Sequence, residues 1–189
     1  MLAGCSTRTA PSFTLSGILS VRSAKTISAG EPTTITIGPR EVADGMPVTL
    51  IATGSYGLRI YQAAFRRREA QFVLSGKETQ QSGLVNLSAL AGQARGNAQL
   101  LIQPSTPVEP LTPLIGARAI IADAQHWSMA VLIPFDTFGN PVLEGTQVEV
   151  LALHPDGRLE QKVISVHHLL AWTRIFSGTK AGRTLIAMH

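Results

Sequence analysis

The stretch IPFDTFGNPVLEGTQV, residues 133–148, decides the fold of this chain. Its centre, Gly139-Asn140, is a dipeptide that supplies positive φ to a tight turn. Pro141 presets the exit of that turn, and Gly145 lets the next strand start. The stretch therefore predicts two extended segments joined by a tight turn, with positive φ at Gly139 or at Asn140.

Alternating apolar and polar residues recur on both sides of this turn. Ile35 and Ile37 alternate with Thr34 and Thr36, and Val148 and Val150 face away from Gln147. This period of two is that of a half-buried strand. Strands are predicted at 33–37, 48–50, 71–74, 84–90, 99–103, 117–122, 128–133, 147–152, 162–166, 169–176 and 184–188. Short strands at this spacing indicate a β-sandwich or a barrel, whereas residues 55–68 fit either a short helix or a long connection.

The large aromatic residues are assigned by context. Trp127 and Trp172 lie in apolar, strand-like segments, which predicts that they pack in the core; exposure of either would favour sugar stacking instead. Phe135 and Phe138 are three positions apart. We expect at least one of them in the core and the other at the end of the sandwich or against a partner.

Four prolines between Pro104 and Pro113 predict an extended connector, because proline cannot donate to a sheet. The resulting division is a first sandwich at 12–104, a linker at 105–114 and a second sandwich at 115–189. The two sandwiches resemble each other at 45–52 and 145–152, an offset of 100. A second pairing, of Gly92 and Gly96 with Gly178 and Gly182, has an offset of 86, which predicts a longer middle in the first copy, at 55–68.

The residues around Gly139 resemble a known family. The order of features here resembles that of the bacterial immunoglobulin-like domains of the invasin and intimin type. It consists of a strand, an aspartate, a Gly-Asn-Pro-Val turn, a glycine and a Val-x-Val strand. Residues 115–189 carry the resemblance well, and residues 12–104 lack the turn and are divergent. The resemblance implies two tandem immunoglobulin-like antiparallel β-sandwiches, of all-β class, used as spacer, adhesive or assembly modules, with Gly139, Asn140, Pro141 and Gly145 as structural turn residues.

The N-terminus, Met1-Leu2-Ala3-Gly4-Cys5, resembles the lipobox of bacterial lipoproteins, although only four residues precede the cysteine. In that family the thiol accepts a diacylglycerol and the cysteine becomes the first mature residue. Cys5 is the only cysteine of the chain. Residues 1–11 are therefore interpreted as a lipobox and tether, with Cys5 as the lipidation site and the bacterial outer membrane, on its periplasmic or surface side, as the location.

Composition argues against several classes of function. Charged residues are 15% of the chain and the net charge is +4, so the sequence is not a dense basic module. The one basic run, Arg66-Arg67-Arg68, is followed by Glu69 and is interpreted as a solvated turn, so no nucleic-acid partner is expected. His167 and His168 would point to opposite faces of a strand and cannot chelate one metal. No catalytic motif, cofactor site or metal site is predicted.

These observations favour a non-enzymatic, lipid-anchored structural protein of the bacterial cell envelope. Its expected partners are other envelope proteins of a multi-subunit assembly, such as a secretion or conjugation machine or a surface appendage, and the membrane through the lipid anchor. The alternative is an adhesin-like binding module that recognises a glycan or a protein. An exposed apolar patch or open sheet edge favours assembly, whereas an exposed aromatic cleft favours glycan binding.

Overall fold

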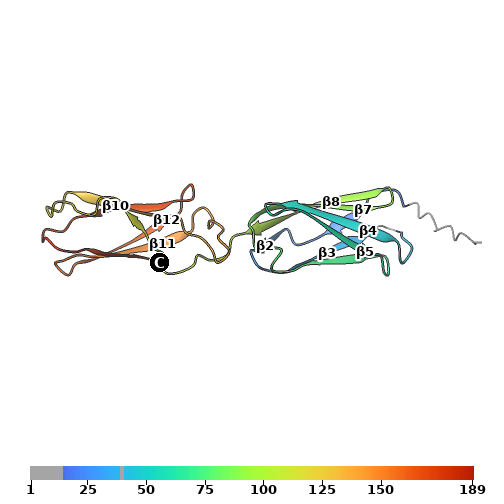
Figure 1. Ribbon diagram of the computed structural model, residues 1–189, viewed down its shortest axis with the longest axis horizontal. Helices are drawn as coiled ribbons and strands as arrows, with labels where there is room; N and C mark the ends of the chain where they lie inside the picture. Colours follow the sequence, from blue (N-terminus) through green and yellow to red (C-terminus); the bar gives the residue numbers. More distant parts are fainter. Residues whose placement is uncertain (1–14, 39–40) are drawn as a thin grey trace, which may run out of the picture. The chain divides into compact units, whose positions relative to one another are not determined.

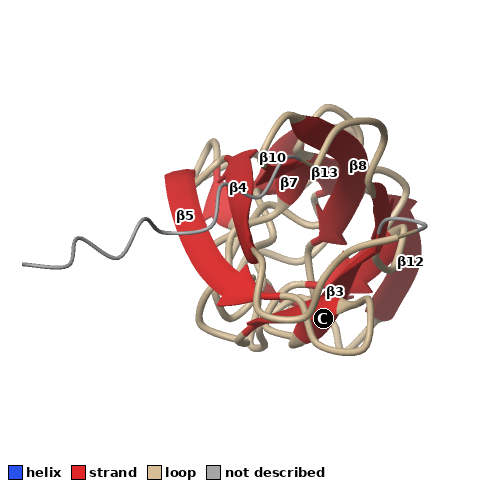
Figure 2. Ribbon diagram, turned by 90° about the vertical axis from the view of Figure 1, so that its right-hand side faces the viewer, coloured by secondary structure: helices blue, strands red, loops and turns tan. Residues whose placement is uncertain are grey.

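The computed structural model describes residues 15–38 and 41–189, and these residues form strands and loops without any helix (Figure 2). They divide into two compact units. The first unit runs to Ile27 and includes Glu31–Glu78 and Gly83–Ile102. The second comprises Ser28–Gly30, Thr79–Ser82 and Gln103–His189. The predicted lipidation site, Cys5, lies outside the described residues.

The first unit is a sandwich of two sheets (Figure 1). One sheet has the order β1-β3-β6 and the other the order β2-β8-β7-β4-β5. The strands are β1 (Ser20–Arg22), β2 (Thr26–Ser28), β3 (Thr33–Gly38), β4 (Pro47–Gly54), β5 (Gly57–Ala64), β6 (Ala70–Leu74), β7 (Gly83–Ala91) and β8 (Ala94–Gln103).

The alternation read from the sequence sets the inner faces of this sandwich. Ile35 and Ile37 are fully buried on β3, as predicted, and Leu50 on β4 and Leu87 on β7 are fully buried in the facing sheet. Two sheets with alternating inward residues bury one face each, which is the condition for a stable sandwich. With this strand order, the first unit is an immunoglobulin-like β-sandwich.

A polar cluster in the first unit joins β5 to the loop after β6. Glu78 accepts hydrogen bonds from the Tyr61 hydroxyl at 2.7 Å and from the backbone and side chain of Ser75 at 2.8 and 2.7 Å. Burial raises the pKa of Glu78, but the hydrogen bonds from Ser75 and Tyr61 outweigh it and lower the pKa to about 2. Burial and the bond to Glu78 raise the pKa of Tyr61 to about 12.

The second unit has two sheets of three strands each. Their orders are β13-β10-β9 and β12-β11-β14, and neighbouring strands in both sheets are antiparallel. The strands are β9 (Leu114–Ile115), β10 (Trp127–Leu132), β11 (Gln147–Leu153), β12 (Leu159–Ser165), β13 (Ala171–Phe176) and β14 (Leu185–Met188). Val148 and Val150 of β11 are buried in the core with Ala130 and Met188, again as the alternation predicts.

The two units repeat each other at a nearly constant offset of about 100 residues, because β4, β5 and β6 correspond to β11, β12 and β13. The equivalence of 45–52 and 145–152 is therefore confirmed.

Two related expectations are wrong. Residues 57–64 form β5, the counterpart of β12, and not a helix or an insertion. The glycine pairs are not equivalent either: Gly92 lies in the turn between β7 and β8, whereas Gly178 and Gly182 precede β14.

The segment before β10 also differs from expectation. Residues 117–122 form no strand, although the sequence predicted one. Among the described residues, the strand that pairs on that side of β10 is the two-residue β9. Within the residues interpreted as a linker, Leu111 packs into the core of the second unit and forms a bridge with Met188.

Candidate docking surface

The turn that decided the fold is built around a buried carboxylate. Asp136, which is 4% exposed, accepts hydrogen bonds from the backbone of Ser105 at 3.0 Å and of Phe138 at 2.9 Å. It also accepts from the backbone and the side-chain Nδ2 of Asn140, both at 2.8 Å. Gly139 has a φ of 80°, so the positive φ expected here is confirmed. The motif residues thus close a loop around one charge.

Asn140 extends this network to another segment of the second unit. Its Nδ2 donates to the carbonyl of Gln80 at 2.7 Å, and its Oδ1 accepts from the backbone of Ser82 at 2.9 Å. Burial alone would raise the pKa of Asp136, but the hydrogen bonds from Asn140 and from the backbone of Ser105 outweigh it and lower the pKa. The cluster is therefore structural: four hydrogen bonds hold an ionised carboxylate inside the turn.

Neither phenylalanine of this motif is in the core, which corrects the sequence expectation. Phe135 is 43% exposed and Phe138 is 39% exposed. The buried apolar residue of the segment is Val142, at 5%. Phe138 instead covers Gly30, where a Cβ would come within 2.5 Å of the phenyl ring. Alternation fails here because the chain turns between the two phenylalanines.

The arginine run of the first unit and the histidine pair of the second unit lie in equivalent tight turns. Arg67 and Arg68 have positive φ of 51° and 69°, and His168 and Leu169 have 49° and 72°. In each unit an acidic residue caps this turn: Asp44 accepts from the Arg67 backbone at 2.8 Å, and Glu144 accepts from the His168 backbone at 3.0 Å. His167 and His168 are thus in a turn and not on a strand as expected.

Gly145, the last of the predicted turn residues, has a φ of 82° and donates its backbone N–H to Val166 at 2.9 Å. Pro141 forms an isolated bridge with Phe135 at the base of the small hairpin. The structure therefore brings Gly139, Asn140 and Pro141 together and places Gly145 at the start of β11.

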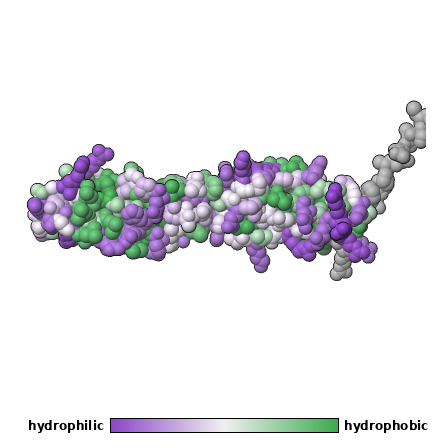
Figure 3. Space-filling model, turned by 90° about the horizontal axis from the view of Figure 1, so that it is seen from below, coloured by the Kyte–Doolittle hydropathy of each residue, from purple (hydrophilic) through white to green (hydrophobic). Residues whose placement is uncertain are grey.

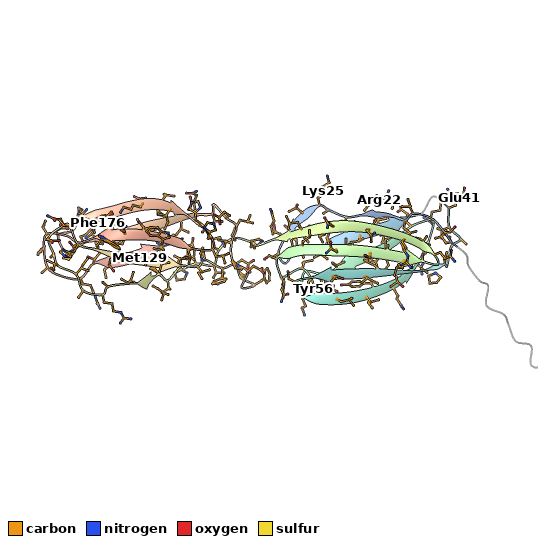
Figure 4. All side chains as sticks on the ribbon, turned by 90° about the horizontal axis from the view of Figure 1, so that it is seen from above. Arg22, Lys25, Glu41, Tyr56, Met129 and Phe176 are labelled. Carbon is orange, nitrogen blue, oxygen red and sulfur yellow. The ribbon has the colours of Figure 1, made fainter. Side chains whose placement is uncertain are left out.

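The most distinctive surface of the second unit is the outer face of the sheet β13-β10-β9, which we call the aromatic face. Trp127 lies opposite Phe176, Met129 opposite Arg174, and Val131 lies between Trp172 and Leu114. Figure 4 labels Met129 on β10 and Phe176 on the neighbouring strand β13. The side chains of Trp127, Met129, Trp172, Phe176 and Leu114 are 43, 39, 50, 40 and 74% exposed. The prediction that both tryptophans lie in the core is wrong.

Cationic groups hold the aromatic rings of this face. The guanidinium carbon of Arg174 lies 4.4 Å from the centroid of the Trp127 ring, and Lys162 Nζ lies 6.0 Å from that of Phe176. Such contacts orient a ring without burying it. Lys162 also donates to the Arg174 carbonyl at 3.2 Å and pairs with Glu160. The aromatic face therefore combines ordered aromatic rings, a methionine and a guanidinium.

Hydrophobic side chains are exposed on the opposite sheet as well. Leu159, Leu153 and Leu185 form one row across β12, β11 and β14 and are 60, 42 and 58% exposed. Figure 3 shows green hydrophobic surface on the second unit, at its left. This row contains no aromatic residue, so it lacks the rings that distinguish the aromatic face.

One titratable residue was not singled out by the sequence. His154 is only 2% exposed, and its Nε2 lies 3.3 Å from Glu160 Oε2. Burial would raise the pKa of Glu160, but hydrogen bonds from Lys162 and His154 outweigh it and lower the pKa. Across the described ranges, no three His, Cys, Asp or Glu side chains are grouped to hold a metal ion. Nor do those ranges include a helix that is long and apolar enough to span a membrane.

Several solved structures resemble this chain at low identity. The crystal structure of invasin, a bacterial integrin-binding protein, aligns over 90% of this chain and 35% of that chain at 15% identity, with a TM-score of 0.44. A tetra-tandem repeat from the extending region of a large adhesion protein aligns over 87% and 42% at 16% identity, with a TM-score of 0.36. Two fibronectin type III domains of chicken tenascin align over 90% and 97% at 12% identity, with a TM-score of 0.35.

The chain thus spans less than half the length of the first two of these proteins. No protein-family model and no curated protein matches the sequence. The assignment of an immunoglobulin-like fold rests on the strand order of each unit, described above.

Proposed function

We propose that this chain is a non-catalytic module of the bacterial cell envelope that docks onto a partner protein of a larger assembly through the aromatic face. The observation that carries the proposal is the exposed apolar patch on this face, in which Met129 and Phe176 lie with both tryptophans beside Arg174. Tryptophan, phenylalanine, methionine and arginine are the residues enriched at the centres of protein interfaces. No Asp or Glu belongs to the strands that form this face, so its centre is poor in the acidic residues that interfaces avoid.

Photo-crosslinking tests this docking directly. A photoreactive residue at Met129 should crosslink to a discrete protein in the native envelope, and Trp172→Ala should remove that adduct. The matched control places the photoreactive residue at Val163, which is 62% exposed on the opposite sheet, and should give no such adduct. An adduct of equal yield from both positions, or one that survives Trp172→Ala, would show that the aromatic face is not the docking surface.

The second candidate is an adhesin-like module that binds a glycan, which the two exposed tryptophan rings favour because sugars stack on such rings. The chain holds only these two tryptophans, so binding on the aromatic face changes the intrinsic fluorescence directly. A saturable change with soluble envelope polysaccharide, absent in Trp172→Ala and retained in Leu159→Ala, would replace the protein-docking proposal with this one.

Lipid anchoring through Cys5 is the other part of the proposal, and it is supported by the lipobox-like residues before Cys5. Two or three acyl chains anchor a protein stably, whereas one binds marginally. Cys5→Ser should therefore move the protein from the outer-membrane fraction to the soluble fraction without changing its thermal unfolding. A mature protein whose mass includes unmodified residues upstream of Cys5 would contradict the anchor.

A further inference from the structure

One end of the first unit brings three segments of the chain together. The carbonyl of Leu15 accepts two hydrogen bonds, at 2.8 and 3.0 Å, from the β7–β8 hairpin. A Cβ at Gly92 of that hairpin would lie 3.3 Å from the Met46 side chain. The Met46 carbonyl accepts at 2.9 Å from the backbone of Phe65, which directly precedes the arginine turn at Arg66–Arg68. The described chain therefore enters the first unit at the end that carries the arginine turn.

The backbone of this turn does not require arginine. Arg66 and Glu69 close it by exchanging backbone hydrogen bonds at 2.8 and 3.1 Å. In the second unit, His167 and Leu170 close the equivalent turn in the same way, at 2.8 and 3.0 Å. The second turn has the same positive φ values without any arginine or lysine. The three arginines are therefore a property of the surface of the first unit, and the turn geometry does not explain them.

Positive charge is in excess at this end of the first unit. Four exposed arginines there form no ion pair with any other described residue: Arg66, Arg67, Arg68 and Arg95. Two of the nearby carboxylates are engaged, because Glu69 pairs with Arg22 and Asp44 accepts from the Arg67 backbone at 2.8 Å. The third, Glu41, is exposed, and Figure 4 labels it at this end. We call the surface formed by the four arginines the basic end.

A hollow of about 560 Å³ lies beside the arginine turn. It is lined by three alanines, by Gln71 and Glu69, and by two of the arginines, Arg66 and Arg67. The alanines leave space, and the guanidinium and amide groups supply hydrogen-bond donors. Glu69, the one carboxylate of this lining, is paired with Arg22. Because the planar fork of a guanidinium matches the oxygens of a phosphate, the hollow suits a phosphate group.

We propose that the basic end binds the surface of an anionic phospholipid membrane, with a headgroup phosphate in the hollow beside Arg66 and Arg67. The proposal rests on the lipid anchor proposed above. Cys5 and Leu15 are ten positions apart, so an anchored Cys5 holds this end within about 35 Å of the membrane. Arginines near an anionic surface each add affinity, and a basic patch is one of the second signals that make lipid anchoring stable.

The test uses the full chain with Cys5→Ser, which cannot be acylated at that position, so that the basic end acts alone. At low salt it should sediment with vesicles of equal parts phosphatidylcholine and phosphatidylglycerol, and not with phosphatidylcholine alone. Added salt should weaken this binding, because it screens exposed charges. Arg66→Gln with Arg67→Gln should weaken it about 25-fold, or about fivefold for each arginine. The matched control, Arg118→Gln with Arg183→Gln, removes two exposed arginines of the second unit and should leave the affinity unchanged.

A fluorescent label tests which end of the first unit faces the vesicle. Since Cys5 is the only cysteine of the chain, Gln93→Cys or Lys77→Cys in the Cys5→Ser chain can carry a single environment-sensitive fluorophore. Gln93 is exposed in the β7–β8 hairpin at the basic end. Lys77 is exposed beyond the end of β6 that lies away from the arginine turn. Anionic vesicles should change the emission of the label at Gln93 and leave that of the label at Lys77 unchanged.

The proposal is overturned if neutral vesicles bind as strongly as anionic ones, if the two double variants weaken binding equally, or if the label at Lys77 responds like the label at Gln93. Inorganic phosphate at matched ionic strength should not release the chain, and complete release would assign the hollow to free phosphate and overturn the membrane proposal. The lipid anchor has separate readouts, the mass and the membrane fractionation of the native protein, so either proposal can fail without the other.

Discussion

Replacing Asp136 by alanine tests how the motif turn holds the second unit together. Asp136 is buried and accepts four hydrogen bonds, from the backbone of Ser105, Phe138 and Asn140 and from the Asn140 side chain. The substitution leaves these donors without their acceptor. A hydrogen bond to a charged group contributes about 1.5–3 kcal/mol, and the four bonds act on one group, so they do not add fully. A buried donor that is left without an acceptor costs roughly 1–3 kcal/mol.

We therefore expect Asp136→Ala to lower the free energy of unfolding of the second unit by about 4 kcal/mol, a large fraction of the ~5–15 kcal/mol of a typical domain. Urea unfolding followed by tryptophan fluorescence measures this unit alone, because both tryptophans, Trp127 and Trp172, belong to it. The control is Asp156→Ala, an exposed carboxylate whose one backbone bond, from Arg158, should contribute less than about 1 kcal/mol.

The pH dependence supplies an independent check. The pKa of Asp136 is lowered in the folded protein, so its stabilisation is complete above the pKa of the unfolded state, about 3.9. This contribution is lost as the pH falls through the folded pKa. Asp136→Ala should remove that part of the acid dependence of the tryptophan transition. A loss below about 1 kcal/mol, or an unchanged acid dependence, would refute the central role of the carboxylate.

Three further outcomes follow from single positions. Gly139→Val should cost about 1–3 kcal/mol through backbone strain alone, because Gly139 has φ 80° and open space around its Cβ position; an unchanged tryptophan transition would contradict this. The pKa of Glu78 is lowered to about 2, so its stabilisation of the first unit is lost between about pH 4.5 and pH 2; tyrosine fluorescence should show a smaller acid dependence in Glu78→Gln. Arg68→Gly and Leu169→Gly relieve positive φ of 69° and 72°. Since glycine also gains entropy in the unfolded chain, each should raise stability by only about 0.5 kcal/mol, seen as a higher melting temperature; a lower one would contradict the turn assignment.

Local rules allowed the sequence to predict much of the sandwich. Ile35 and Ile37, like Val148 and Val150, alternate with polar residues, so which side of the strand is buried could be read directly. The conformation at Gly139 is likewise a local property, since few residues adopt positive φ at low cost. The histidine turn was missed because its positive-φ residues, His168 and Leu169, carry no glycine signal.

The exposed aromatic face shows where such reasoning ends. On β10 the inward residues are Ser128, Ala130 and Leu132, and the outward ones include Trp127 and Met129. Both sides of this strand carry apolar side chains, and the tryptophan and the methionine are on the outside. Hydrophobicity by itself therefore selects the wrong face for the core. The facing sheet decides instead, because the space that it leaves is filled by small side chains at these positions.

The sequence by itself determined that the chain is all-β, that apolar and polar residues alternate along its strands, and that a glycine turn lies at Gly139. Each of these depends on neighbours within a few residues. Only the tertiary structure decided that β14 is the counterpart of β7, and that the pairing of Gly92 with Gly178 was misleading. Strand order is set by contacts between residues far apart in the chain, and similar turns recur at positions that are not equivalent.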